Sequence, residues 1–246
     1  MRPTLLLYAT ALAACAPASA PQPVTLAVAT DLAPWAHAHK EQLGDALGGP
    51  VTIVAGPSGQ LATQLLAGAP FDLLLAADSA TLDRIMPSDR CDNSSRRPFA
   101  TGHLAIAVGP HLALPATVAT LASDAVATIA IANPEHAPYG RLARGYLAAL
   151  PEASRLLPKL VFAASAADAA AWVDRGAADA AISAWSLLRA QPEARRMQLP
   201  SEATSLPATG LVCGATAPSL APRWQALTET AWFQSSLAEA GFGPPP

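Results

Sequence analysis

The chain has 246 residues, of which 52% are hydrophobic and 13% are charged, and its formal net charge is −3. This composition can bury a sizeable core and argues against disorder, and the length suits one domain or two small lobes. The weak negative charge, with no basic stripe, argues against a nucleic-acid-binding protein.

The N-terminal segment MRPTLLLYATALAACAPASA has the features of a secretory signal. One basic residue is followed by an apolar run of about a dozen residues and then by small residues, which is too short to span a membrane. Within it, Leu12-Ala13-Ala14-Cys15 resembles a lipobox. We expect residues 1–14 to be a lipoprotein signal peptide and Cys15 to carry the lipid anchor. The alternative is an ordinary signal, cut after APASA, that discards Cys15.

If the chain is exported, the other two cysteines, Cys91 and Cys213, lie in an oxidising compartment. In an oxidising compartment they can form a disulfide, and Cys91 lies in a polar segment, SDRCDNSSRR, that such a bond would restrain. Two free thiols are the alternative. The expected location is periplasmic or otherwise extracytoplasmic, at a membrane only through a lipid anchor.

Apolar, β-branched runs alternate with helix-forming segments along the rest of the chain, which predicts an α/β protein with mainly parallel sheets. Asp31 is placed to cap the first helix, and Gly48-Gly49 to end it. The expected strands are 24–30, 51–56, 71–78, 103–110, 128–132, 160–164, 178–185 and 206–215. The expected helices are 31–49, 58–68, 79–86, 141–150, 166–176 and 221–241.

Four junctions, each leading from a strand into a helix, carry hydroxyls, a carboxylate or free backbone N–H groups. Helix starts bind anions, and ligands of parallel sheets lie beyond the carboxyl ends of the strands. Two junctions fall in each half of the chain, which predicts a cleft between two lobes. The junctions are Thr30-Asp31, Pro57-Ser58-Gly59, Ala137-Pro138-Tyr139-Gly140 and Ala164-Ser165-Ala166.

Several blocks of the sequence resemble the periplasmic molybdate-binding proteins, the substrate-binding subunits of molybdate ABC transporters. They are LAVATDLAPW, GPSGQLATQLLAGAPFDLLLAAD, PFATGHLAIAV, NPEHAPYGRLA and AADAAAWVDRGAADAAISA, and with their spacing they cover nearly all of residues 24–246. The resemblance implies two Rossmann-like lobes joined by crossing strands, closing on one tetrahedral oxyanion. Lobe 1 would comprise residues 24–102 and 206–246, and lobe 2 residues 103–205.

The same resemblance implies a binding protein without catalysis or cofactor. The ligand would be molybdate or tungstate, and the metal would be held only as this oxyanion. Its partners would be an ABC permease and the ATPase subunit, and the chain itself would be a monomer. Carried over by position, the oxyanion contacts fall on Thr30, Asp31, Ser58, Tyr139 and Ala166, the last through its backbone N–H.

Two positions depart from the family pattern. In the branch of the family that shares APYG and ATG with this chain, the position of Asp31 holds an amide or a hydroxyl. A carboxylate at this position would repel a bound dianion. Asp31 could point away and cap the helix, or be protonated and donate to the oxyanion, or signal a different solute, perhaps neutral or cationic. A tyrosine of the other branch falls on Ala184, so its hydroxyl is absent.

Two other functions are weaker alternatives. GPSGQ around Ser58 is a poor nucleophile elbow, and a triad with His136 and Asp31 would make the chain an exported serine hydrolase. Ser58 could equally be a helix cap. His37 and His39 point to different sides of a helix, which argues against a metal site formed by these two residues.

Overall fold

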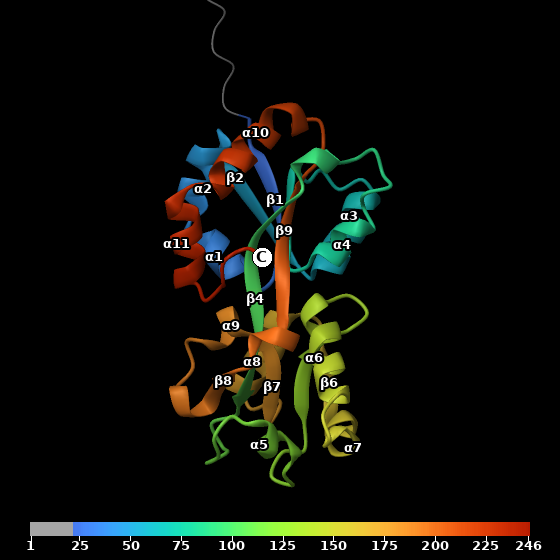
Figure 1. Ribbon diagram of the computed structural model, residues 1–246, viewed down its shortest axis with the longest axis vertical. Coiled ribbons are helices and arrows are strands. Elements are labelled where there is room, and N and C mark those ends of the chain that lie inside the picture. Colours follow the sequence, from blue (N-terminus) through green and yellow to red (C-terminus); the bar gives the residue numbers. More distant parts are fainter. Residues whose placement is uncertain (1–21) are drawn as a thin grey trace, which may run out of the picture.

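A computed structural model describes residues 22–246, so the predicted signal and Cys15 lie outside the described part (Figure 1). Two groups of helices and strands are stacked along the long axis, and they are called lobe 1 and lobe 2 here. Strands β4 (Arg97–Val108) and β9 (Ser205–Val212) run from one lobe into the other. The predicted limits of the lobes, 102/103 and 205/206, fall on these strands and remain a prediction.

In lobe 1, β1 (Val24–Ala29) lies between β2 (Val51–Gly56) and β3 (Leu73–Ala76), parallel to both. In lobe 2, β5 (Ile129–Ala132) lies in the same way between β6 (Leu160–Ala163) and β7 (Ala180–Ala184). These are the strands that the sequence predicts, each followed by a helix, and the crossover helices account for the parallel pairing.

The crossing strands pair antiparallel with each other and with their neighbours. β9 pairs with β3 in lobe 1, β4 pairs with β7 and with the short β8 (Arg196–Gln198) in lobe 2, and β4 pairs with β9 between the lobes. The result is one continuous sheet in the order β2-β1-β3-β9-β4-β7-β5-β6. The α/β prediction is confirmed, and the antiparallel share of the sheet comes from the strands that cross.

Helices cover both faces of the sheet in each lobe (Figure 1). Successive residues of β1 show this, since Leu26 and Val28 pack into one buried cluster and Ala27 into another on the opposite face. Helices that the sequence predicts include α2 (Lys40–Leu47), α3 (Ser58–Leu66), α4 (Ser79–Asp83), α6 (Pro138–Ala148), α8 (Ala166–Asp174) and α10 (Ala217–Thr228).

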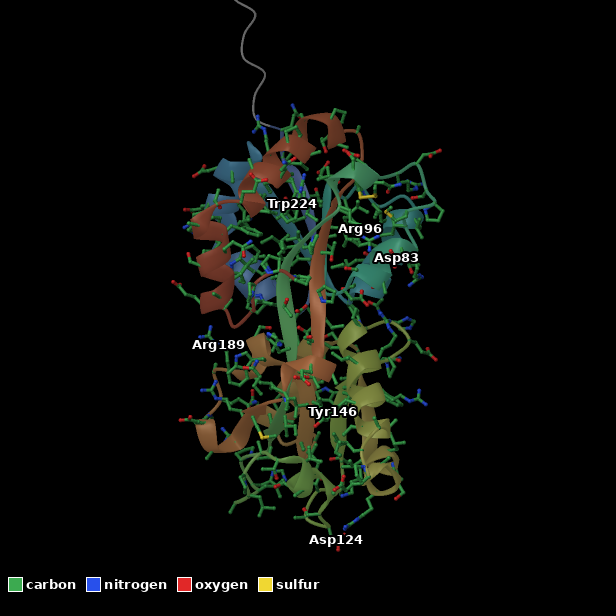
Figure 2. The ribbon with its side chains drawn as sticks, in the orientation of Figure 1. Asp83, Arg96, Asp124, Tyr146, Arg189 and Trp224 are labelled. Carbon is green, nitrogen blue, oxygen red and sulfur yellow. A yellow bond between two sulfur atoms is a disulfide. The ribbon has the colours of Figure 1, made fainter. Side chains whose placement is uncertain are left out.

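Aromatic rings fix the start of β4 against the C-terminal helices. Phe99 of β4 meets Trp224 of α10 edge-on, with 5.6 Å between ring centroids, and Phe233 of α11 lies 5.9 Å from Trp224. Figure 2 labels Trp224 within lobe 1. A side chain at Gly210 of β9 would lie 2.2 Å from the Trp224 ring, so this position requires glycine.

A layer of small side chains joins α8 to the sheet of lobe 2. This buried cluster, the alanine layer, consists of alanines apart from Val173 and Leu188. Its alanines are Ala105, Ala107, Ala130, Ala163, Ala169, Ala170, Ala178 and Ala181. Small side chains allow the helix backbone to approach the strands closely, and interiors at this density leave few voids.

The first predicted helix, 31–49, differs from the structure in two ways. It is divided into α1 (Ala33–Ala38) and α2 at His39, whose ring Nδ1 lies 2.9 Å from the Trp35 carbonyl. Asp31 does not cap it, because residues 30–32 form a turn in which Leu32 donates to the Ala29 carbonyl at 2.9 Å. Leu32 is the N-cap, without a side-chain capping bond, so the capping prediction is wrong.

Two other helices begin where local chemistry favours a start. α6 begins at Pro138, three residues before the predicted start, because proline suits the first position of a helix. The predicted helix 221–241 is two helices, since Thr230 is extended and its hydroxyl accepts from Phe233 to cap α11 (Ala231–Glu239). Three short helices were not predicted: α5 (Val118–Ala122), α7 (Ala153–Leu156) and α9 (Trp185–Leu188).

From residue 22 onward, no helix has both the length and the apolar character needed to cross a bilayer. The polar loop after α4 is tied to lobe 1 in two ways. Arg96 donates to Asp83 at 2.7 Å, a pair labelled in Figure 2. Cys91 is bonded to Cys213, with an S–S distance of 2.11 Å and a sequence separation of 122.

We predict that replacing Cys91 and Cys213 by alanine lowers the free energy of unfolding by about 2 to 5 kcal/mol, because the bond closes a long loop of the unfolded chain. Urea unfolding with and without a reductant measures this. The reductant should lower the free energy of unfolding of the wild type to that of the variant and should leave the stability of the variant unchanged. Equal stabilities of oxidised wild type and variant would contradict the prediction.

Candidate functional site

The junctions between strands and helices lie together where the two lobes meet. The backbone N–H of Gly59, in the first turn of α3, donates to the carbonyl of His136 at 3.1 Å, which joins the second junction to the third. The first junction reaches the third through Asp31 and Tyr139, whose side chains affect each other's ionisation. The structure thus brings helix starts from both lobes to one place, the arrangement in which α/β sheets bind ligands.

A pocket of about 300 Å³ lies beside these junctions and is lined by both lobes. Thr30, Pro57 and Ser165 line it, and each directly precedes a buried residue of the predicted site, namely Asp31, Ser58 and Ala166. Of the predicted contacts, Thr30 lines the pocket, whereas Asp31, Ser58, Tyr139 and Ala166 do not. The polar side chains of the lining are Thr30, Gln60, Gln64, Ser165 and Asp168, none of them cationic.

Asp31 and Tyr139 form the buried centre of the site, each 3% exposed. They meet over Gly102 of β4, where an added Cβ would lie 2.0 Å from the Tyr139 hydroxyl and 3.8 Å from Asp31 Oδ2. Within the described residues, neither Asp31 Oδ2 nor the Tyr139 hydroxyl completes a hydrogen bond of good geometry. Two polar atoms are thus buried close to each other, and neither is fixed by a well-formed hydrogen bond.

Burial controls the ionisation of this pair. It raises the pKa of Asp31 from 3.8 to about 6, opposed by the nearby Tyr139 hydroxyl and by the N–H groups of Asp31 and Leu32. The negative charge of Asp78 adds to the rise. Burial, and then the charge of Asp31, raise the pKa of Tyr139 well above its usual value, so its hydroxyl remains a donor at neutral pH.

Ser58 occupies the first position of α3 and is 1% exposed. Its Oγ accepts a hydrogen bond from the backbone N–H of Ala77 at 3.0 Å, which leaves the hydroxyl hydrogen to donate elsewhere. It is not the helix cap, because Pro57 is the N-cap and no side chain caps this end. The capping alternative for Ser58 is therefore wrong.

Ala166 is the first residue of α8, behind the N-cap Ser165. Ser165 accepts from the N–H of Asp168 at 3.1 Å, and the hydroxyl of Ser183 donates to the Ala166 carbonyl at 2.7 Å. These bonds fix the first peptide units of the helix. The N–H of Ala166, like those of all first helical residues, has no acceptor inside its helix.

Two further contacts hold the lobes together around these groups. Arg141 of α6 donates to Asp78 at 2.8 Å, and the other Asp78 oxygen accepts from Thr81 to cap α4. The hydroxyl of Ser186, at the start of lobe 2's α9, donates to the backbone carbonyl of Asp31 at 3.1 Å. Lobe 1 and lobe 2 are therefore in direct contact around these groups.

Sequence reasoning did not place Gly102, Asp78, Arg141 or Ser186 in the site. Asp78 follows β3 at its carboxyl end, so the rule that found the other junctions could have found it. Gly102 stands in the block PFATGHLAIAV, but nothing local marks the close approach of Tyr139. Ser186 and Arg141 act through contacts distant in sequence.

The weaker alternatives gain no support from the contacts of their residues. Ser58 bonds to Ala77, whereas the His136 ring lies 3.9 Å from Glu135, and no hydrogen bond among the described residues joins Ser58 to His136. Over residues 22–246, no three His, Cys, Asp or Glu side chains gather as a metal site. Ala184 is buried at the end of β7, opposite Leu104, and offers no hydroxyl.

Comparison with known proteins places this geometry among binding proteins. The family model described as bacterial extracellular solute-binding protein matches residues 24–243. The molybdate-binding protein ModA of Azotobacter vinelandii is 35% identical over 124 residues, 50% of this chain and 49% of that protein. ModA of Rhodobacter capsulatus is 32% identical over 136 residues, 55% and 54% of the two chains. The chain thus spans about half the length of the curated relatives it matches.

Solved structures show the same fold over most of the chain. The periplasmic molybdate-binding protein of Azotobacter vinelandii superposes with a TM-score of 0.80 and 23% identity, covering 91% of this chain and 100% of that one. The sulfate-binding protein SubI of Mycobacterium tuberculosis gives a TM-score of 0.71 at 17% identity, covering 90% and 86%. At these identities the likeness establishes the two-lobed fold alone.

We predict that Gly102→Ala weakens ligand binding at least about tenfold, because the new methyl group would displace the buried Tyr139 hydroxyl. Calorimetric titration with molybdate measures the affinity of each variant. Gly145→Ala is the matched control, since no atom lies within 4 Å of its added Cβ. Its affinity should be unchanged. Equal affinities of the two variants would show that the Gly102 contact is not needed.

We also predict that Asp31→Asn changes how stability depends on pH. The folded pKa of Asp31 is raised, so its stabilising contribution is complete below about 3.8 and is lost as pH rises through about 6. The loss amounts to roughly 3 kcal/mol. Urea unfolding of both proteins at several pH values should show that the free energy of unfolding of the wild type falls relative to that of the variant as pH rises from about 3.8 to about 6. Parallel curves would contradict the prediction.

Proposed function

This chain belongs to the bacterial extracellular solute-binding protein family, and from that premise we propose that it captures molybdate or tungstate and delivers it to an ABC permease. The observation that carries the proposal is the convergence of helix starts and buried neutral donors where the two lobes meet. The pocket beside them has no cationic lining side chain and one carboxylate, that of Asp168. The similarity to molybdate-binding proteins over half of their length supports the same ligand.

A dianion can be held by neutral groups when several N–H and O–H donors converge on it. The proposed contacts are Thr30, Asp31, Ser58, Tyr139 and Ala166. The hydroxyl of Ser58 has its hydrogen free, the Tyr139 hydroxyl stays protonated, and Ala166 offers an N–H at a helix start. The partial positive charge of the helix starts favours an anion without the desolvation of a full charge.

Release requires the lobes to separate, and the contacts between them show what has to break. The bond from Gly59 to His136, the ion pair of Asp78 with Arg141, and the bond from Ser186 to Asp31 all join lobe 1 to lobe 2. Strands β4 and β9 stay paired across the boundary and would act as the hinge. Opening would expose the buried donors and let the permease receive the ligand.

The location proposed for the protein is extracytoplasmic, as a monomer. Residues 1–14 would be removed and Cys15 acylated, which would keep the binding lobes near a permease and its ATPase subunit. The disulfide between Cys91 and Cys213 is consistent with an oxidising compartment. No catalytic step and no cofactor are part of the proposal.

A second candidate is the same kind of binding protein for another solute. The carboxylate of Asp31 favours it, because an ionised carboxylate accepts hydrogen bonds and does not donate them. A neutral or cationic solute would satisfy Asp31 without a proton. Titration with oxyanions separates the two candidates directly.

Calorimetric titration with molybdate, tungstate and sulfate tests the proposal. Molybdate and tungstate should bind one to one, with sulfate much weaker. Ser58→Ala should weaken binding about 10- to 100-fold through the loss of a hydrogen bond to a charged ligand. Ser219→Ala, an exposed serine of α10, is the control and should bind as the wild type does. Absence of heat with all three oxyanions would contradict the molybdate proposal and favour the second candidate, a binding protein for a neutral or cationic solute.

A further inference from the structure

Asp31 presents an unsatisfied acceptor at the centre of a site built otherwise from donors. Its Oδ2 is buried, and its approach to the Tyr139 hydroxyl is close enough to affect the pKa of both groups but does not meet the geometry of a hydrogen bond. An ionised carboxylate offers no hydrogen to an oxyanion and repels it, whereas a neutral carboxyl can donate one hydrogen bond. A ligand oxygen that reached Asp31 Oδ2 would therefore need a hydrogen between the two atoms.

We propose that the site binds its oxyanion together with one proton, held in a hydrogen bond between Asp31 and a ligand oxygen. This inference rests on the proposed function. In an alkaline medium the empty site carries ionised Asp31, and the complex forms when the dianion and one proton from solvent enter together. No bond other than the O–H bond is made, and no group is oxidised or reduced.

Tyr139 and Gly102 leave few other ways to satisfy Asp31. The tyrosine hydroxyl has one hydrogen, and a ligand placed between the two side chains could receive it. Gly102 has no side chain, so the protein supplies no polar group at that point of β4. The backbone carbonyl of Asp31 is already bonded to Ser186, which fixes the residue so that its side chain remains at the lobe boundary.

The charged groups around Asp31 favour its neutral form. Asp78 contributes a negative charge, and Arg141 is committed to Asp78 at 2.8 Å. Tyr139 is held protonated by burial. His103 follows Gly102 on β4, but its ring lies toward Gly243. Burial raises the pKa of Asp31 to about 6, and a bound dianion would raise it further by repulsion.

The pH dependence follows from this linkage. Below about pH 6 the empty site already holds the proton, and binding of a dianion takes up none. Above it each binding event removes one proton from solution, and the affinity falls about tenfold for each pH unit. Asp31→Asn carries a permanent amide donor, so its affinity for the dianion should not depend on pH in this range.

The test is calorimetric titration of molybdate at about pH 8 in two buffers of different ionisation enthalpy, repeated near pH 5, since the difference in heat counts the protons taken up. Wild type should take up about one proton per molybdate at the higher pH and almost none at the lower. Asp31→Asn should take up almost none at either pH. Ser58→Ala should bind more weakly and still take up about one proton.

The outcomes separate this inference from the function on which it rests. Wild type that binds molybdate at the higher pH without proton uptake would overturn the inference and leave the function standing. An Asp31→Asn variant that takes up as many protons as the wild type would also overturn it. Failure of wild type and Asp31→Asn to bind any oxyanion at either pH would overturn the function and the inference together.

Discussion

Strands β4 and β9 pair antiparallel across the boundary between the lobes, and every other element is attached to one side of that pair or the other. β9 continues into the parallel strands of lobe 1 through β3, and β4 into those of lobe 2 through β7. Because the sheet is continuous, the carboxyl ends of the parallel strands in the two lobes meet at the crossing. The helix starts of both lobes converge for this reason.

Closure of the lobes changes the chemistry of the groups that it encloses. Asp31 belongs to lobe 1 and Tyr139 to lobe 2, and both are buried where the two lobes meet. Burial at this boundary is the main cause of the raised pKa of both Asp31 and Tyr139. The contact between the lobes and the protonation of Asp31 are therefore coupled.

The sequence was sufficient for the alternation of strands and helices and for the four junctions, because these depend on local hydrophobic pattern and on residues such as Pro138. It was insufficient where a contact joins distant segments. The ring of His39 divides a helix that looks continuous, and Thr230 caps a second helix within an apparently single one. The side chain of Asp31 looks like a cap, and only the turn before α1 directs it to the lobe boundary. Gly102 owes its importance to a tyrosine far along the chain.

The alanine layer beneath α8 has a mechanical consequence. Side chains this small have almost no rotamers to exchange, so the layer cannot absorb a change in volume by repacking. We therefore expect a displacement at one end of α8 to be passed along the helix to Ser165 and Ala166 at the other. Lobe 2 would then move as one stiff body about the crossing strands, and its hold on a ligand would depend on alanines that do not line the pocket.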